Sequence, residues 1–347
     1  MTGTGAPPSL IHTRTRRAAD GSVDRLLTVK PGMCGPVSQF AGRLGDWTWD
    51  TVSDACGIDA YTARTPGGQP CYLSFYYFRI RSGGLLHPAA LGFGDRLHVT
   101  SRVFGDGGES VLTLHRVTRT TDAAASDDAF DEGLDPGEFF TEQRPDRMYV
   151  QNFNRWISRG ASGGNAGLVS AAPAGFRHGH LPRLPAALSP RIPCGRARST
   201  GTFHDPDAEP GWEPTVRGHE FTCPVDPTRD INGAGLLYFA AYFAIVESAL
   251  LRLWHHQGRP GPLFRDRTVL DTQLCYLGNA DPDTVLRVAL SSWHRTGEPR
   301  EGTEGTEEKW NVVLTHAGTG RLLAVCTQHV RLEHRRTEEN SRAAQRR

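Results

Sequence analysis

Three tyrosines, Tyr72, Tyr76 and Tyr77, lie within one aromatic segment, residues 71–81. A phenol with an ordinary pKa of ~10 acts as a nucleophile at neutral pH only if a base or strong local stabilisation assists it. No histidine or aspartate adjacent in the sequence supplies that assistance. A tyrosine in such a segment is also an ordinary core ring whose hydroxyl is hydrogen-bonded. The residues alone therefore leave both interpretations open.

A second kind of chemistry is indicated by a repeated pattern. Residues 33–42 and 231–240 each place a glycine-bearing turn before an apolar helix. The N-terminal amides of a helix can stabilise an oxyanion without any ionisable side chain. In the first copy these would be the groups from Gly35 to Ser38, and in the second copy those around Gly233, with Asn232 orienting the substrate. Alternatively, the glycines and Asn232 serve only tight turns.

The two copies differ just before their helices. Met33-Cys34 in the first copy corresponds to Ile231-Asn232 in the second. This divergence suggests that only one of the two sites is competent. Cys34 itself has no cationic neighbour in sequence that would lower its pKa, so we interpret it as a packing residue.

Carboxylates and histidines support other hypotheses. Asp46 and Asp50 in the first helix and Glu247 in the second could act as the base of a thioesterase, and a buried Glu247 would have a raised pKa. An exposed Glu247 would only aid solubility. His87 and Asp271 are weak candidates for the His/Asp pair of a dehydratase, because the stretch after His87 lacks the proline that ends the dehydratase motif.

Composition excludes several classes of function. The 39 basic and 38 acidic residues nearly cancel, so the chain lacks the basic field that nucleic-acid binding needs. The seven cysteines are scattered without metal-ligand spacing, which predicts no metal site and a reducing, cytoplasmic location. The longest apolar stretch, residues 233–246, is too short to span a bilayer, and no signal-peptide core is present.

Periodicity predicts two similar units. Each has one long helix, residues 37–55 and 235–256, followed by strands that would form an antiparallel sheet around it. Strands are expected at residues 25–30, 71–81, 96–103, 110–118 and 148–157 in the first unit. In the second unit they are expected at residues 267–276, 284–292, 310–316 and 322–334. The expected α+β architecture is a double hot-dog fold, with two antiparallel sheets each wrapped around a long central helix.

These elements define five segments. A disordered leader is expected over residues 1–24, a first hot-dog domain over 25–158 and an interdomain connection over 159–200. A second hot-dog domain would follow over 201–334, with a disordered tail over 335–347. Within the strand at 71–81, alternation predicts that Tyr72, Tyr76 and Phe78 face the helix, whereas Tyr77 and Arg79 face away.

The chain resembles the bifunctional acyltransferase/decarboxylase family of leinamycin-type polyketide biosynthesis. The resemblance runs from about residue 29 to residue 334 and is carried by residues 31–35, 45–49, 72–80, 92–96, 152–156, 230–239 and 273–281. It implies that methylmalonyl or a related malonyl-type group is taken from coenzyme A onto an enzyme tyrosine. Decarboxylation and delivery of propionyl to an acyl carrier protein would follow, with no cofactor.

The resemblance and the predicted faces together favour Tyr76, then Tyr72, as the nucleophile. A thioesterase or dehydratase on the same fold is an alternative, as is a non-catalytic protein that binds acyl thioesters. One chain would be a monomer equivalent to the dimer of single-copy hot-dog proteins, or would itself form a homodimer.

Overall fold

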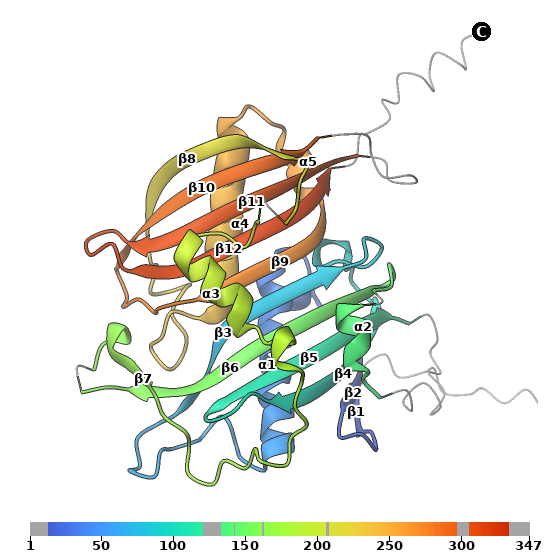
Figure 1. Ribbon diagram of the computed structural model, residues 1–347, viewed down its shortest axis with the longest axis vertical. Helices are drawn as coiled ribbons and strands as arrows, with labels where there is room; N and C mark the ends of the chain where they lie inside the picture. Colours follow the sequence, from blue (N-terminus) through green and yellow to red (C-terminus); the bar gives the residue numbers. More distant parts are fainter. Residues whose placement is uncertain are drawn as a thin grey trace, which may run out of the picture.

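The computed structural model describes residues 13–120, 133–141, 143–161, 163–205, 208–296 and 305–332. These residues form one antiparallel sheet of 12 strands, in the order β1-β2-β4-β5-β6-β3-β9-β12-β11-β10-β8, with β7 paired to β6 (Figure 1). The expectation of two separate sheets was therefore wrong. The two halves join because β3 pairs with β9 from Tyr77↔Cys275 to Arg81↔Asp271.

The elements follow the predicted order closely. The strands of the first half are β1 (Arg14–Arg17), β2 (Val23–Thr28), β3 (Tyr72–Ser82), β4 (Arg96–Gly105), β5 (Ser110–Arg119), β6 (Arg147–Arg159) and β7 (Leu168–Ser170). Those of the second half are β8 (Trp212–Pro224), β9 (Thr268–Tyr276), β10 (Val285–Arg295), β11 (Thr306–His316) and β12 (Leu322–Leu332). The α-helices are α1 (Val37–Cys56), α2 (Pro136–Phe140), α3 (Arg191–Thr200), α4 (Phe239–His256) and α5 (Gly261–Arg265).

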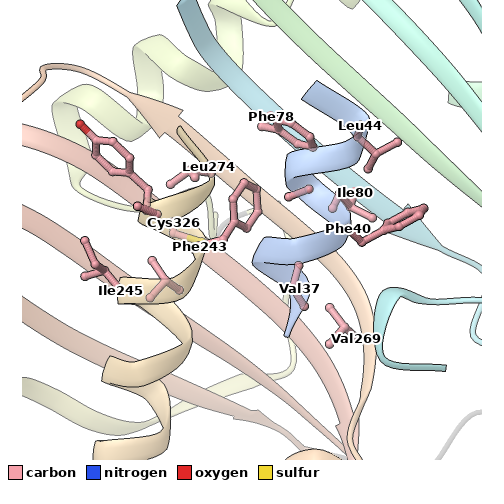
Figure 2. Packing of buried hydrophobic residues seen from close by; sticks show 14 of the residues in the cluster. Val37, Phe40, Leu44, Phe78, Ile80, Phe243, Ile245, Val269, Leu274 and Cys326 are labelled. Carbon is pink, nitrogen blue, oxygen red and sulfur yellow. The ribbon is translucent and has the colours of Figure 1, made fainter. Parts of the chain in front are cut away.

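The long helices α1 and α4 pack together on one face of the sheet (Figure 1). Figure 2 shows the core beneath them, where Phe40 and Leu44 of α1 and Phe243 of α4 meet Phe78 of β3 and Leu274 of β9. All five side chains are at most 1% exposed. Burial of this continuous apolar layer holds the two halves together as one body.

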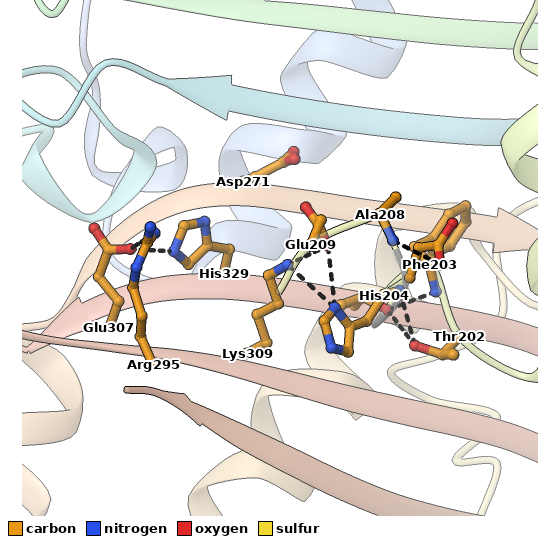
Figure 3. A network of polar contacts seen from close by, with 12 residues as sticks. Thr202, Phe203, His204, Ala208, Glu209, Asp271, Arg295, Glu307, Lys309 and His329 are labelled. Atoms are coloured by element: carbon orange, nitrogen blue, oxygen red, sulfur yellow. Dashed lines mark hydrogen bonds and ion pairs between the residues drawn. The ribbon is translucent and has the colours of Figure 1, made fainter. Parts of the chain in front are cut away.

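The opposite face of the sheet is covered in part by α2, α3 and the chain between the halves (Figure 1). A second apolar cluster lies there and includes Tyr77, Phe153 and Cys194. On the same face of the second half, Figure 3 shows a polar network in which Lys309 of β11 contacts Glu209 and the Nδ1 atom of His204. In the described part of the connection between the halves, β7 pairs with β6 and α3 contributes Cys194 to the second apolar cluster.

Three sequence predictions need correction. Arg14–Arg17 pairs with β2, so the end of the expected disordered leader is a strand, while residues 1–12 lie outside the described residues. Helix α4 begins at Phe239 rather than at residue 235, because residues 231–237 close a turn with an Ile231↔Leu237 bridge. The strand β8 was missed. The expected disordered tail, residues 335–347, lies outside the described residues.

None of the helices in the described part of the chain has the length and apolarity needed to cross a membrane.

Candidate active site

A cavity of about 410 Å³ lies between α1, the first turn of α4 and the beginning of β3. β3 pairs with β9 only from Tyr77 onward, so residues 72–76 have β6 as a neighbour on one side and the cavity on the other. The loop after β9, including Leu277, Gly278 and Asn279, completes the wall. The cavity thus occupies the gap that opens where the two central strands separate.

A β-bulge at Tyr76 shapes this part of β3. The register with β6 shifts between Phe75 and Tyr77, which makes Tyr76 the extra residue, and bulges often occur beside active sites. Because of this extra residue, the side chains before the bulge lie on the opposite faces of the sheet from those that strict alternation predicts. Phe75 packs on the helices, and the ring of Tyr76 packs against Phe153 at a centroid distance of 5.8 Å. The prediction that Tyr72 and Tyr76 share a face with Phe78 was therefore wrong.

Six of the eight tyrosines in the chain line this one cavity: Tyr61, Tyr72, Tyr76, Tyr238, Tyr242 and Tyr276. Two of them have hydroxyls committed to the backbone, since Tyr242 donates to the Gly278 carbonyl at 2.7 Å and Tyr276 to the Phe239 carbonyl at 3.2 Å. These two bonds fix the loop after β9 and the start of α4 relative to each other. The tyrosine cluster is therefore partly structural.

Other phenols remain available to a ligand. The hydroxyls of Tyr72, Tyr76 and Tyr238 have no hydrogen-bond partner within the described ranges. Burial raises the pKa of Tyr76, and it raises the pKa of Tyr238 to about 12. At neutral pH these two side chains are consequently neutral hydrogen-bond donors.

The N-terminus of α4 opens toward the cavity. Asn279 holds Leu237, which lies two residues before the first residue of α4. Its Oδ1 accepts from the Leu237 N–H at 2.9 Å, and its Nδ2 donates to the Leu237 carbonyl at 3.0 Å. Phe239, the first residue of α4, also lines the cavity. Its N–H has no acceptor in the part of the chain that the structure describes. This N–H is a candidate oxyanion donor.

The N-terminus of α1 is closed instead. The Glu247 carboxylate, from the middle of α4, accepts a hydrogen bond from the Val37 N–H at 2.9 Å and a further bond from the Ser38 N–H. Arg267 donates to the same carboxylate at 3.0 Å. Burial raises the pKa of Glu247, and the neighbouring arginine and amides oppose that rise. Two of the amides in the predicted oxyanion group Gly35 to Ser38, those of Val37 and Ser38, are thus already bonded to Glu247.

Pseudo-symmetry relates these two ends. Counting from Val37 and Phe239, Gly45 and Glu247 are each the ninth residue of their helix. Each lies against the first residue of the other helix, Gly45 against Phe239 and Glu247 against Val37. A glycine leaves one end open to the cavity, and a carboxylate fills the other. The N-termini of the two helices therefore differ in whether a ligand can reach them.

Ionisable groups are sparse in the cavity wall. Among the described lining residues Asp46 is the single carboxylate, and no histidine or cysteine is present. The side chain of Asp46 is 53% exposed and pairs with Arg43 at 3.2 Å, and burial of part of the group raises its pKa. The wall therefore offers many neutral donors and one solvent-exposed base. Within the described ranges, no three His, Cys, Asp or Glu side chains lie close enough to hold a metal ion.

The cavity brings together some of the predicted site residues. Tyr72, Tyr76 and Asn232 line it, whereas Gly35 and Gly233 do not. Gly35 has a φ of +100°, which supports its alternative role in a tight turn. Asn232 spans its own turn, because its Oδ1 accepts from the N–H groups of Ala234 at 3.0 Å and Leu236 at 3.1 Å.

Sequence reasoning missed other parts of the wall, including Gly45, Tyr238, Phe239, Tyr276 and Asn279. All of them belong to segments on which the family resemblance was based, residues 45–49, 230–239 and 273–281. Their place in those segments was the signal in the sequence that could have identified them. His87 and Asp271, the candidate dehydratase pair, are not among the lining residues.

Comparison with known proteins identifies a family and a fold. Residues 24–205 match the family model described as the LnmK N-terminal Hot Dog Fold domain. No curated protein sequence matches the chain.

Solved structures with similar folds include a protein assigned as an oleoyl thioesterase from Lactobacillus plantarum, with a TM-score of 0.51 and 10% identity over 90% of this chain and 95% of that one. An acyl-ACP thioesterase from Bacteroides thetaiotaomicron has a TM-score of 0.48 and 9% identity over 89% and 97%. A 12:0-ACP thioesterase from Umbellularia californica has a TM-score of 0.47 and 12% identity over 91% and 96%.

Proposed function

Because the chain belongs to the LnmK N-terminal Hot Dog Fold domain family, we propose that it is an acyl-thioester enzyme that acts as an acyltransferase/decarboxylase. Its substrate would be methylmalonyl or a related malonyl-type group carried on coenzyme A. The enzyme would transfer this group to a tyrosine, decarboxylate it and pass propionyl to an acyl carrier protein. The reaction would require no metal, biotin or nucleotide.

The composition of the cavity is the observation that carries this proposal. Loss of CO2 from the malonyl-type ester carried by the tyrosine leaves an enolate, which needs hydrogen-bond donors at its oxygen and a pocket of low polarity. The free Phe239 N–H and the neutral Tyr238 hydroxyl are such donors. No general base is needed for this step, and the wall offers only the solvent-exposed Asp46 as one.

Tyr72 and Tyr76 are the candidate nucleophiles, since both line the cavity and neither hydroxyl has a partner in the described structure. The phenol oxygen would attack the thioester carbonyl, and the thiolate of coenzyme A would leave with the phenol proton. The bond to CO2 would then break, and protonation of the enolate carbon would give propionyl. Tyr77 is a poor candidate, because it is 1% exposed, bonds to Gln273 at 3.0 Å and does not line the cavity.

Cationic side chains support the assignment of an anionic thioester carrier. Arg155 and Arg321 line the cavity; the side chain of Arg155 is 32% exposed and pairs with Glu109 at 3.5 Å, and Arg321 donates to the Asn279 carbonyl at 2.7 Å. Guanidinium groups at such a site suit the phosphates of coenzyme A and the phosphopantetheine arm of a carrier protein. The same chemistry would allow both thioester carriers to use one cavity.

One alternative has a specific observation in its favour. Asp46 could activate water for thioester hydrolysis, because it lines the cavity and burial raises its pKa. Its exposure and its ion pair with Arg43 argue against that role. A non-catalytic protein that binds acyl thioesters would use the same cavity without turnover.

Intact-protein mass spectrometry after incubation with methylmalonyl-CoA, with CO2 release measured in parallel, tests the proposal. Wild type, Tyr72→Phe and Tyr76→Phe are compared with Tyr77→Phe, a matched control in the same strand. We expect an acyl adduct and CO2 in wild type and in the control, and loss of the adduct in one of the other two variants. Free methylmalonate without CO2 would instead indicate a thioesterase, and binding without turnover a binding protein.

A further inference from the structure

The ring of Phe239 lies where the cavity meets the helix pair. It stacks on Phe75 of β3 with a centroid distance of 4.0 Å and an interplanar angle of 30°, and on Phe78 at 6.1 Å and 12°. Phe239 itself is partly exposed and lines the cavity, whereas Phe78 is fully buried and does not. The Phe239 ring therefore forms the boundary between the cavity and the core.

Gly45 of α1 provides the space for this ring. A Cβ atom at position 45 would lie 2.0 Å from Cζ of Phe239, far inside van der Waals contact. A glycine inside a helix costs roughly 0.5–1 kcal/mol of stability relative to alanine. The ring can occupy its position only because this residue has no side chain, so both helices and β3 hold Phe239 in place.

The same residue also provides the candidate oxyanion donor. A thioester oxygen bonded to the Phe239 N–H would lie within one side-chain length of the Phe239 ring. Arg155 donates to the hydroxyl of the exposed Ser170 at 3.4 Å, and both residues line the cavity, whereas Phe75 and Phe239 contribute stacked apolar rings to its wall. The carrier would thus extend toward Arg155, and the acyl chain would extend toward the ring.

We propose that Phe239 sets the upper limit on acyl-chain length in this cavity and that Gly45 positions it to do so. This inference rests on one part of the proposed function, namely that an acyl thioester binds in the cavity. With the ring stacked on Phe75, the wall is close-packed at Phe239, so an acyl chain that reaches the ring can extend no further. Longer chains would require the ring to leave its stack with Phe75.

The test measures binding rather than turnover. A series of S-alkyl-coenzyme A thioethers, from ethyl to octyl, can be titrated calorimetrically, because these analogues can be neither hydrolysed nor decarboxylated. Phe239→Ala and the milder Phe239→Leu are compared with wild type. Phe78→Leu is the matched control, since it removes a neighbouring ring of the same stack that does not line the cavity.

In wild type we expect affinity to rise about fourfold per added methylene until the chain reaches the ring, and to fall for longer chains before octyl. In Phe239→Ala the rise should continue to octyl, and Phe239→Leu should lie between the two. Phe78→Leu should follow wild type. Affinity that rises to octyl in wild type, or equal changes in the Phe239 and Phe78 variants, would overturn the inference.

The outcomes separate this inference from the proposed function. A length limit at Phe239 without CO2 release from methylmalonyl-CoA would support the inference and refute the decarboxylase. CO2 release without a length limit would do the opposite. Absence of any thioether binding in wild type would refute both.

Discussion

The carboxylate of Glu247, in the middle of α4, accepts a hydrogen bond of 2.9 Å from the backbone N–H of Val37, the first residue of α1. The equivalent position at the other end of the helix pair is Gly45, which faces Phe239 and leaves the N-terminus of α4 open. The Glu247 carboxylate thus occupies the N-terminus of α1, whereas the N-terminus of α4 borders the cavity. The two halves have the same architecture and different chemistry.

Replacing Glu247 should affect stability rather than catalysis. Glu247→Gln keeps an acceptor for the Val37 N–H but leaves Arg267, which is 4% exposed, without its counter-charge. An unpaired buried charge costs about 3–5 kcal/mol, so we expect a loss of that size in the free energy of unfolding, measured by urea denaturation. The double variant Glu247→Leu/Arg267→Leu should recover most of it. Full stability in Glu247→Gln would contradict a buried ion pair at this position.

Gly45→Ala should reduce activity far more than stability. The added methyl group would displace Phe239 together with its N–H, and a misplacement of this kind can lower the rate by about 100-fold. Alanine's higher helix propensity offsets part of the packing strain, so stability should change by less than about 2 kcal/mol. CO2 release and denaturant unfolding check the two effects.

The double variant Gly45→Ala/Phe239→Leu is the control for that experiment, because leucine lacks the ring atoms Cζ, Cε1 and Cε2 that lie nearest the added methyl group. With that clash relieved and the backbone N–H of residue 239 retained, the double variant should regain part of the activity. Equal loss of activity in the single and the double variant would show that Gly45 matters for another reason than the position of Phe239.

The order of elements was predictable from the sequence, because period and turn residues are local signals. The end of α1 at Gly57, which has a φ of +62°, illustrates this. The direction of Tyr76 was not predictable, since one extra residue in β3 opposite β6 reverses the alternation before it. The partner of Glu247 was equally inaccessible, because Val37 is 210 residues away in the chain. The pairing of β3 with β9, which joins the two halves into one sheet, is a long-range contact that no local sequence pattern specifies.

The pH dependence should separate decarboxylation from acyl transfer. Tyr238 has a pKa of about 12 and burial raises the pKa of Tyr76 above its ordinary value of 10.0, so both stay protonated below about pH 9. CO2 release from a preformed acyl adduct should therefore vary little between about pH 7 and 9. Formation of the adduct on a phenol should accelerate with pH, up to about tenfold per unit. A bell-shaped profile centred near pH 6.5 would indicate a histidine base and contradict the proposed site.

Tyr238→Phe should impair decarboxylation and leave the acyl adduct able to form. The variant removes a neutral donor whose hydroxyl has no partner in the described structure, and loss of one oxyanion donor typically lowers the rate by about 100-fold or more. We expect the mass of the adduct to shift from the decarboxylated to the carboxylated form. Tyr61→Phe is the control, because that hydroxyl already bonds to Asp50 at 2.7 Å. An adduct of unchanged composition in Tyr238→Phe would remove this residue from the reaction.

Acid stability should depend on Glu307, which lies on the face of the sheet opposite the long helices (Figure 3). His329 at 3.2 Å and Arg295 at 3.1 Å lower the pKa of Glu307 from 4.5 to about 2. A lowered folded-state pKa means that this stabilisation is present above the unfolded value and is lost as the pH falls from about 4.5 through 2. Screening by solvent reduces the effect to about 1 kcal/mol.

Urea denaturation should show wild type losing this increment between about pH 5 and 2, whereas Glu307→Gln, which lacks it at pH 7, should show a flatter dependence. Parallel curves for the two proteins would contradict this role of Glu307.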